Sequence, residues 1–231
     1  MRTGKILGNA LLVLLLTGCL LQGGKEVRSY VGAEKEMNLL REQAEKYPGS
    51  GVKAERREQA EPEIDFQLLK TVNPDIRGWL RIPDTPIDYP VLIGTEEGDY
   101  LKRNFRGEED PLGSVFSYVG TDLGGDAHIY LFAHNLISGQ MFGGLKKFLD
   151  PAFAETHVRA FLYTPGGCRK FRFLSAVSCR MDQVFQQKEA ESGKALSLIT
   201  CGGGEGTIWR TVVTFSEEKA PEAAEAPAAP G

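Results

Sequence analysis

A cysteine at the end of an apolar run is the first candidate for chemistry. Cys201 follows the run LSLIT at 196–200 and is followed directly by three glycines at 202–204. The apolar run predicts a strand that holds the sulfur in place, and glycines leave the space in front of it open to a peptide. A buried structural cysteine is the alternative, because cysteine often packs as a small hydrophobic residue. A nucleophilic thiol therefore requires a partner that stabilises its thiolate.

Two further side chains at predicted strand ends are suited to support this thiol. His134 follows the apolar run 128–133, and an imidazolium is one of the groups that stabilise a thiolate. Arg210 stands nine positions after Cys201 (210 − 201 = 9), at the start of the last predicted strand. A glycine-rich hairpin would bring it back beside the cysteine, where its guanidinium could donate two hydrogen bonds to an oxyanion. We predict Cys201 as nucleophile, His134 as its ionised partner and Arg210 as electrophilic helper.

The other histidines and cysteines fit this site less well. His128 begins the same predicted strand and would lie about 20 Å from the candidate histidine at the usual rise per residue. His157 lies in a polar stretch, which predicts a solvated surface residue. Cys168 and Cys179 flank one predicted strand, so an extended chain would place them about 35 Å apart, too far for a disulfide. Cys201 is thus expected to be a thiol with a chemical role.

Short alternating or β-branched runs recur between turn signals in the central part of the chain. The eight runs predicted as strands are 78–82, 87–93, 114–118, 128–133, 158–163, 170–178, 195–200 and 209–215. Eight short strands separated by Pro, Gly and Asp predict a mainly β fold, an eight-stranded and closed or nearly closed barrel. Two short flanking helices are predicted at 64–71 and 141–149.

The segments around this domain differ from it in composition. Residues 26–62 are rich in Glu, Lys, Arg, Gln and Ala and predict a polar, partly helical stalk. The catalytic domain is predicted at 63–216. Residues 217–231 are almost entirely Ala, Glu and Pro, which predicts a disordered tail because they bury too little apolar surface. The net charge of −4 argues against nucleic acid as a partner.

Residues 1–25 have the pattern of a signal peptide or an N-terminal membrane anchor. Arg2 and Lys5 precede an almost uninterrupted apolar stretch at 6–21. This stretch is shorter than the roughly 20 residues that comfortably span a bilayer, so a removable signal peptide and a short anchor both remain open. The positive charges favour an N-terminus that stays inside, which places the rest of the chain outside.

Cys19 adds a third possibility for this segment. The run LTGC at 16–19 resembles the lipobox at which bacterial lipoproteins are cleaved and acylated on the cysteine. A small apolar residue within an anchor is the alternative role for this cysteine. We predict a protein on the extracellular face of the cell membrane, attached through an N-terminal anchor or a lipid-modified Cys19.

Several motifs together resemble those of the class B sortases. In chain order they are NPDIRGWL at 73–80, IPDTPIDYPV at 82–91, YL at 100–101, GSVF at 113–116, AHN at 133–135 with MF at 141–142, and LITC at 198–201 with Arg210. The resemblance covers about 73–215, and the order and spacing of the motifs are more specific than any one of them. It implies an eight-stranded sortase-type β-barrel and a cell-wall sorting reaction that uses neither a metal nor an organic cofactor.

The resemblance also implies a reaction and its participants. In the family, the cysteine attacks the Thr-Gly bond of a C-terminal sorting signal on a secreted protein and holds a thioacyl-enzyme. An amine of peptidoglycan or of a pilin then takes the acyl group. By this similarity Cys201 is the nucleophile, His134 the acid and later the base, and Arg210 the oxyanion stabiliser. The substrate-binding residues that it implies are Tyr100, Leu101, Ile199 and Thr200.

The chain departs from the family pattern at three places. Ala133 precedes the candidate histidine, where class B members usually carry glycine. Ile199 stands two positions before Cys201, where they usually carry a small polar residue. The connection 179–194 is short, whereas class B enzymes usually place a long helix there. The sorting motif and the acceptor amine are therefore left open.

Two other functions fit part of the pattern. A cysteine protease of another fold would also combine a cysteine with a histidine, but the many short strands argue against it. A non-catalytic surface lipoprotein that uses the barrel as a binding module would account for Cys19 and Ile199. The presence of Cys201, His134 and Arg210 together favours the enzyme.

Overall fold

The computed structural model describes residues 31–46, 62–186, 193–203 and 206–218. The chain divides into two compact units, 1–63 and 64–231. The predicted anchor at 1–25 and the part of the predicted tail after residue 218 lie outside the described residues. Within the described ranges, no helix combines the length and the apolar character needed to cross a bilayer.

The first unit falls in the segment that we predicted as a partly helical stalk. Residues 31–44 form a helix, in keeping with the many Glu, Lys, Leu and Arg residues there, which favour helix. Strand β1 (Glu45–Lys46) follows this helix directly. Strand β2 (Glu63–Ile64) lies at the boundary of the two units.

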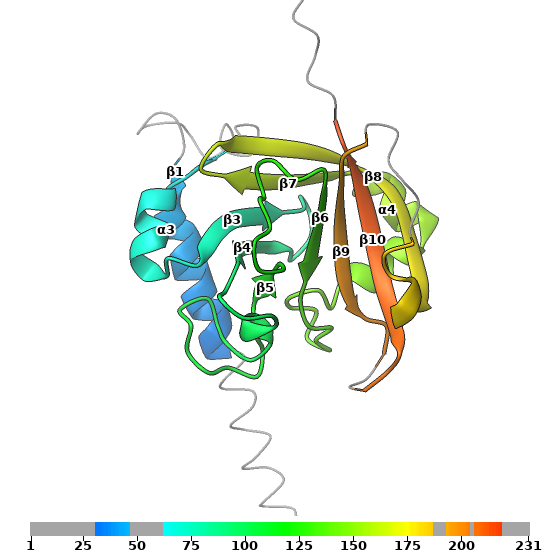
Figure 1. The fold of residues 1–231 in the computed structure, drawn as a ribbon, viewed down its shortest axis with the longest axis horizontal. Helices are drawn as coiled ribbons and strands as arrows, with labels where there is room; N and C mark the ends of the chain where they lie inside the picture. The colour runs from blue at the N-terminus through cyan, green and yellow to red at the C-terminus, as the bar shows by residue number, and fades with distance from the viewer. Residues whose placement is uncertain (1–30, 47–61, 187–192, 204–205, 219–231) are drawn as a thin grey trace, which may run out of the picture. The chain divides into compact units, whose positions relative to one another are not determined.

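The second unit is a closed barrel of eight strands (Figure 1), which confirms the predicted fold class. Each of the eight predicted runs overlaps one strand. The strands are β3 (Ile76–Arg81), β4 (Asp88–Leu92), β5 (Val115–Phe116), β6 (His128–Phe132), β7 (Arg159–Thr164), β8 (Gly167–Arg180), β9 (Ala195–Cys201) and β10 (Trp209–Glu217). Their order around the barrel is β10-β8-β7-β3-β4-β5-β6-β9.

Two of the eight strand pairs are parallel, and one of them positions the site. Strands β6 and β9 run parallel, while β9 and β10 run antiparallel. The ends of β6 and β9 and the beginning of β10 therefore meet at one edge of the barrel. Leu131, Leu198 and Val213 form one fully buried row across these three strands. This buried row gives the three strands a common hydrophobic support below that edge.

Helix α3 (Phe66–Val72) lies where the helix at 64–71 was predicted. It begins after Asp65, whose side chain accepts hydrogen bonds from the backbone of Gln67 and Leu68, each at 3.1 Å. These bonds satisfy two of the amide groups that a helix start leaves without a partner. The helix ends before Pro74, which disfavours helical backbone in the residue before it.

The helix predicted at 141–149 is wrong in extent and type. Only the 3₁₀ turn η2 (Leu145–Leu149) forms there, and helix α4 (Pro151–Thr156) follows it. Met141 has φ of 51°, a left-handed backbone that a helix excludes. Asp150 caps α4 through a 3.0 Å bond from the backbone of Ala152. Two further 3₁₀ turns are η1 (Asp99–Leu101) and η3 (Met181–Gln183).

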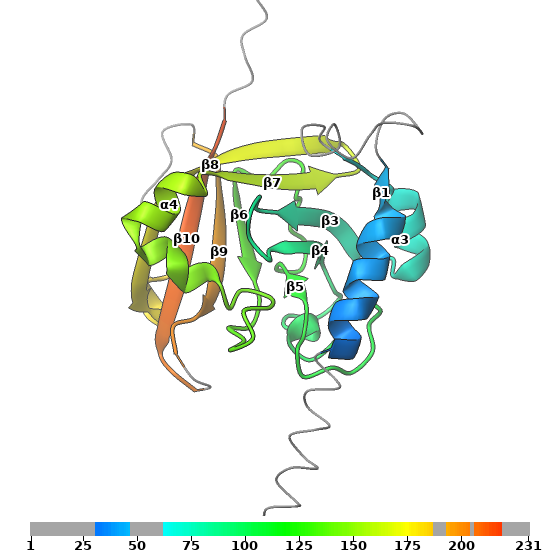
Figure 2. The same ribbon diagram turned by 180° about the vertical axis from the view of Figure 1, so that it is seen from behind.

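The turn η2 packs against β8 and β10, and α4 packs on η2. Figure 2 shows α4 beside β10. A cluster of aromatic side chains fills the contact. Phe148 of η2 has its ring centroid 5.9 Å from those of both Phe173 and Phe215. His157 belongs to the same cluster, because it stacks on Phe153 at 3.8 Å. His157 is thus half-buried, with one face packed on Phe153, where the sequence predicted a solvated surface residue. Polar neighbours in the sequence did not reveal that the histidine ends α4 and packs on that helix.

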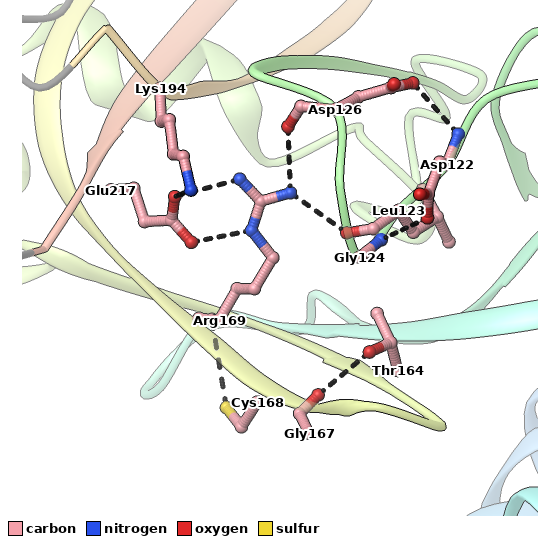
Figure 3. A network of polar contacts seen from close by, with 10 residues as sticks. All are labelled: Asp122, Leu123, Gly124, Asp126, Thr164, Gly167, Cys168, Arg169, Lys194 and Glu217. Atoms are coloured by element: carbon pink, nitrogen blue, oxygen red, sulfur yellow. Dashed lines mark hydrogen bonds and ion pairs between the residues drawn. The ribbon is translucent and has the colours of Figure 1, made fainter. Parts of the chain in front are cut away.

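Arg169 joins three segments of the barrel through a partly enclosed polar network (Figure 3). Its guanidinium forms two hydrogen bonds to the carboxylate of Glu217, at 2.6 and 2.9 Å. It also donates to the backbone carbonyls of Leu123 and Asp126, each at 3.0 Å. The Arg169 and Glu217 side chains are only 10% and 15% exposed. Glu217 is the last residue of β10, so the strand runs one residue beyond the predicted domain boundary at 216.

This network predicts a loss of stability in acid. The hydrogen bonds from Arg169 hold the pKa of Glu217 below its ordinary value of 4.5. A lowered folded-state pKa contributes stability that is fully present above the ordinary value and is lost as pH falls through the folded pKa. We expect the stability advantage of the parent over Glu217→Gln, measured by urea unfolding, to be largest near neutral pH and to shrink below about pH 4.5.

Glu218→Gln provides the matched control for this prediction. Glu218 lies 4.0 Å from Arg159, whose side chain is 61% exposed, so water screens the pair. We expect this variant to resemble the parent at neutral pH. A stability difference between the parent and Glu217→Gln that stays constant from pH 7 to pH 3 would contradict the proposed linkage.

Candidate functional site

The three predicted catalytic residues lie at the edge where β6, β9 and β10 meet. Cys201 and Arg210 are direct partners in the antiparallel β9–β10 pair, so both side chains leave the same face of the sheet. In the parallel β6–β9 pair, Phe132 is the partner of Ile199. β6 ends at Phe132. The same register carried two residues further (132 + 2 = 134; 199 + 2 = 201) would set His134 opposite Cys201.

Two side-chain hydrogen bonds clamp the chain after β6 onto β9. Asn135 donates from Nδ2 to the backbone carbonyl of Cys201 at 2.7 Å. Thr200 donates from Oγ1 to the carbonyl of Ala133, also at 2.7 Å. These bonds extend the strand contact beyond the end of β6. His134, which lies between the two clamped residues, is therefore held at the level of the cysteine.

Cys201 is the last residue of β9 and carries a free, half-buried thiol. The glycine after it turns the chain toward β10, and the backbone N–H of Gly202 donates to the carbonyl of Trp209 at 2.9 Å. A side chain at Gly202 would place its Cβ 3.2 Å from both Cβ and the carbonyl carbon of Trp209. The glycine run predicted as open space thus also allows the close return of the hairpin.

The imidazole of His134 lies against the segment around η1. Its Nε2 is 2.7 Å from the backbone carbonyl oxygen of Leu101. Its own carbonyl accepts a hydrogen bond from the backbone of Phe142 at 3.0 Å. Leu101 was predicted as a substrate-binding residue, and the structure assigns its backbone to the histidine while its side chain stays 44% exposed.

Arg210 lies along the β9–β10 hairpin and the end of β8. Its guanidinium donates to the carbonyls of Thr207 and Trp209, at 2.6 and 2.8 Å, and lies 3.2 Å from the sulfur of Met181. On its other side in the sheet, Arg210 is paired with Cys179 of β8. Burial raises the pKa of the Cys179 thiol, an effect that the charge of Arg210 partly offsets. Cys179 is therefore poorly suited to act as a second thiolate.

Three of the predicted substrate-binding residues are almost fully buried. Tyr100 has its hydroxyl between Asn73 and Asp75. Burial raises its pKa to about 12, an effect that the hydrogen bond from Asn73 opposes and that Asp75 adds to. Ile199 packs in a small apolar cluster with Val184. Thr200 forms the clamp to β6 described above. No contact with a substrate is established for these residues, so their binding role stays a prediction.

The sequence analysis missed two contributors to the geometry of the site. Asn135 bonds the main chain of Cys201, although the sequence places the two 66 positions apart. Gly113 adopts a left-handed φ of 61° and packs close to the carbonyl of Leu101. The only sequence signals were an asparagine directly after the candidate histidine and a glycine before a predicted strand.

The connection between β8 and β9 is built differently from the long helix expected in class B enzymes. Its described part contains the 3₁₀ turn η3 and then Val184 and Phe185, while 187–192 lie outside the described residues.

In the part of the chain that the structure describes, no group of three or more His, Cys, Asp or Glu side chains is arranged to hold a metal ion.

Comparison with known proteins relates the chain to one family of enzymes. Sortase B of Listeria monocytogenes is 37% identical over 103 residues, which are 44% of this chain and 42% of that protein. Sortase B of Staphylococcus aureus is 29% identical over 146 residues, 63% of this chain and 58% of that protein. The chain spans about half the length of these curated relatives. No family model matches it.

A solved structure extends the comparison to the fold. Sortase B from B. anthracis superimposes with a TM-score of 0.67 and 21% identity, covering 84% of this chain and 100% of that chain. At this identity the likeness concerns the fold alone. The closed eight-stranded barrel and the sequence relatives agree with each other. The chain is therefore a homologue of the class B sortases, and its described barrel has the sortase fold.

Proposed function

We propose that this chain is a cysteine transpeptidase of the sortase type. It cleaves a C-terminal sorting signal of secreted proteins through a thioacyl-enzyme and joins them to an amine of the cell wall or of a pilin. The observation that carries the proposal is the cross-strand pairing of Cys201 with Arg210, with His134 clamped at the same level. The similarity to sortase B proteins supports the same activity.

The proposed reaction has two acyl-transfer steps. In the first, the thiolate of Cys201 attacks the scissile carbonyl carbon, the C–N bond breaks, and the imidazolium of His134 gives a proton to the leaving amine. In the second step, the nitrogen of the incoming amine attacks the thioester carbonyl carbon while neutral His134 takes a proton from that amine. The C–S bond then breaks and the thiolate of Cys201 returns. Protons balance over the two steps, so no cofactor is required.

Arg210 supplies the positive charge for the tetrahedral intermediates. In the described structure its guanidinium donates to two carbonyls of its own hairpin, from Thr207 and Trp209. A guanidinium carries five N–H donors, so it can keep part of this contact and still donate to a developing oxyanion.

A trapping experiment tests the proposal. We expect the purified full chain, incubated with a panel of peptides that carry sorting motifs and with hydroxylamine, to release a peptide hydroxamate. Mass spectrometry should detect an acyl adduct on Cys201 when hydroxylamine is left out. Hydroxylamine acts here as a small amine that resolves the thioester in place of the natural acceptor.

The failure of this experiment has a defined meaning. If no motif yields a hydroxamate or an adduct, and if Cys201→Ala binds the same peptides as the parent, the transpeptidase proposal is overturned. The barrel would then be a binding module. A hydroxamate that still forms in Cys201→Ala would equally reject the assigned nucleophile.

We also propose that the domain works on the extracellular face of the cell membrane. Arg2 and Lys5 before the apolar stretch 6–21 favour an N-terminus that stays inside and a domain that is exported, and the sequence around Cys19 supports lipid attachment. Labelling of cells with a radioactive fatty acid distinguishes the two modes of attachment. Label that disappears in Cys19→Ala identifies a lipoprotein, and membrane association without label identifies an anchor. Recovery of the whole protein from the cytoplasm would reject both.

A further inference from the structure

The hydrogen bond of His134 determines which of its nitrogens carries a proton. Nε2 lies 2.7 Å from the backbone carbonyl oxygen of Leu101, and a carbonyl oxygen only accepts hydrogen bonds. Nε2 must therefore be the donor. A neutral imidazole carries one hydrogen, so the lone pair of neutral His134 lies on Nδ1.

Gly113 packs against the same side of the imidazole ring. A Cβ at this glycine would lie 2.6 Å from the carbonyl oxygen of Leu101 and 3.1 Å from Cδ2 of His134. Cδ2 is bonded to Nε2, so the Nε2 side of the ring is enclosed by Leu101 and Gly113. The left-handed φ of 61° further restricts this position to glycine.

The turn that carries the Leu101 carbonyl is fixed by a buried polar network. Tyr100 of η1 is 3% exposed. Its hydroxyl accepts a hydrogen bond from Nδ2 of Asn73 at 2.9 Å and donates to Oδ2 of Asp75 at 2.8 Å. The carbonyl of Tyr100 accepts from the backbone of Ser114 at 3.0 Å, next to Gly113. η1 is thus tied to the start of β3 on one side and to the approach to β5 on the other.

We propose that Tyr100, with Asn73 and Asp75, is a positioning element for His134. The network holds the Leu101 carbonyl against Nε2, so that Nδ1 exchanges the proton with Cys201 and with the leaving and incoming amines. The hydrogen on Nε2 stays bonded to that nitrogen and donated to the Leu101 carbonyl throughout the cycle. This inference rests on the proposed function for its account of turnover, but not for the tautomer.

The tautomer is measurable without a substrate. The chain contains three histidines, so the full chain labelled with ¹⁵N-histidine gives three sets of ring signals, and His134→Gln identifies the set of interest. At a pH where His134 is neutral, we expect its Nε2 to be protonated and its Nδ1 to be unprotonated. A neutral His134 with the proton on Nδ1 overturns the inference, whatever the enzyme's activity.

Two substitutions test the positioning role. Gly113→Ala would crowd the Leu101 carbonyl directly, and Tyr100→Phe would remove the hydroxyl that Asn73 and Asp75 hold. For both we expect kcat to fall about tenfold or more with KM nearly unchanged, as is common when the group that orients a catalytic side chain is removed. The His134 ring signals should shift, with both tautomers present in the neutral form.

Tyr130→Phe is the matched control. Its hydroxyl contacts a different histidine, His128, at 3.1 Å, and its side chain is half-buried. We expect this variant to keep the kcat and the His134 signals of the parent. If Tyr100→Phe is folded, as judged by its thermal transition, and retains the parent tautomer and kcat, the positioning role of Tyr100 is rejected.

The results separate this inference from the proposed function. If no sorting peptide is turned over but the Nε2–H tautomer is found and is lost in Tyr100→Phe, the transpeptidase proposal fails and the positioning of His134 stands. If peptides are turned over but neutral His134 carries its proton on Nδ1, the positioning inference fails alone.

Discussion

Replacement of Cys201 by alanine is expected to lower the rate of hydroxamate formation by at least about 10³-fold, because the thiolate forms the covalent intermediate. The fold should persist, since Cys201 is half-buried at the end of β9 and the hydrogen bond from Asn135 goes to its backbone carbonyl. Rates measured with the full chain and a reactive sorting peptide, together with thermal unfolding, check both parts of this expectation.

Cys168→Ala is the matched control for the loss of a thiol. Cys168 lies on β8 beside Tyr163 of β7, in the hairpin that joins these strands, and it forms no part of the row that contains Cys201 and Arg210. We expect its activity to equal that of the parent. Equal losses in the two cysteine variants would mean that thiol removal acts through stability, and the role of Cys201 as nucleophile would be refuted.

Arg169→Met is expected to lower the free energy of unfolding by about 3 kcal/mol, within the range measured when one partner of a buried ion pair is removed. The substitution leaves the carboxylate of Glu217 partly buried without its two strongest hydrogen bonds. It also removes the donors to the carbonyls of Leu123 and Asp126. Urea unfolding at pH 7 measures the difference.

Two further variants make the stability prediction specific. Arg159→Met removes an exposed arginine from a 4.0 Å ion pair, and we expect a loss of no more than about 1 kcal/mol. Combining Arg169→Met with Glu217→Gln should recover part of the loss, since the buried charge is then gone. A single Arg169→Met variant as stable as Arg159→Met would show that the network in Figure 3 contributes little.

The eight strands could be predicted because their signals are local. Alternating or β-branched residues between turn residues occur within each run, so every predicted run overlaps a barrel strand. The predicted helix at 141–149 failed because its apolar spacing also suits a 3₁₀ turn, η2, that packs on β8 and β10. The packing of His157 could not be predicted either, since its stacking partner Phe153 belongs to a short helix that was not expected.

The catalytic residues of the candidate site could be predicted from the sequence, but most of the groups that hold them in place could not. Cys201, His134 and Arg210 each lie at or next to a strand end. Their residue types and the residues beside them were enough to predict their chemical roles. The groups that hold them could not be predicted, because a carbonyl such as that of Leu101 has no sequence signature. The binding role of Tyr100 stays a prediction, and the sequence did not show that its hydroxyl bonds Asn73 and Asp75.

The sequence alone determined which side chains could carry the chemistry and that each lies at the end of a strand, since both properties depend on adjacent residues. Only the tertiary structure decided that these ends meet. The parallel pairing of β6 with β9 joins residues 66 positions apart, as Asn135 and Cys201 show. That pairing depends on the closure of the whole barrel and on the buried row beneath it, a cooperative property that no local pattern encodes.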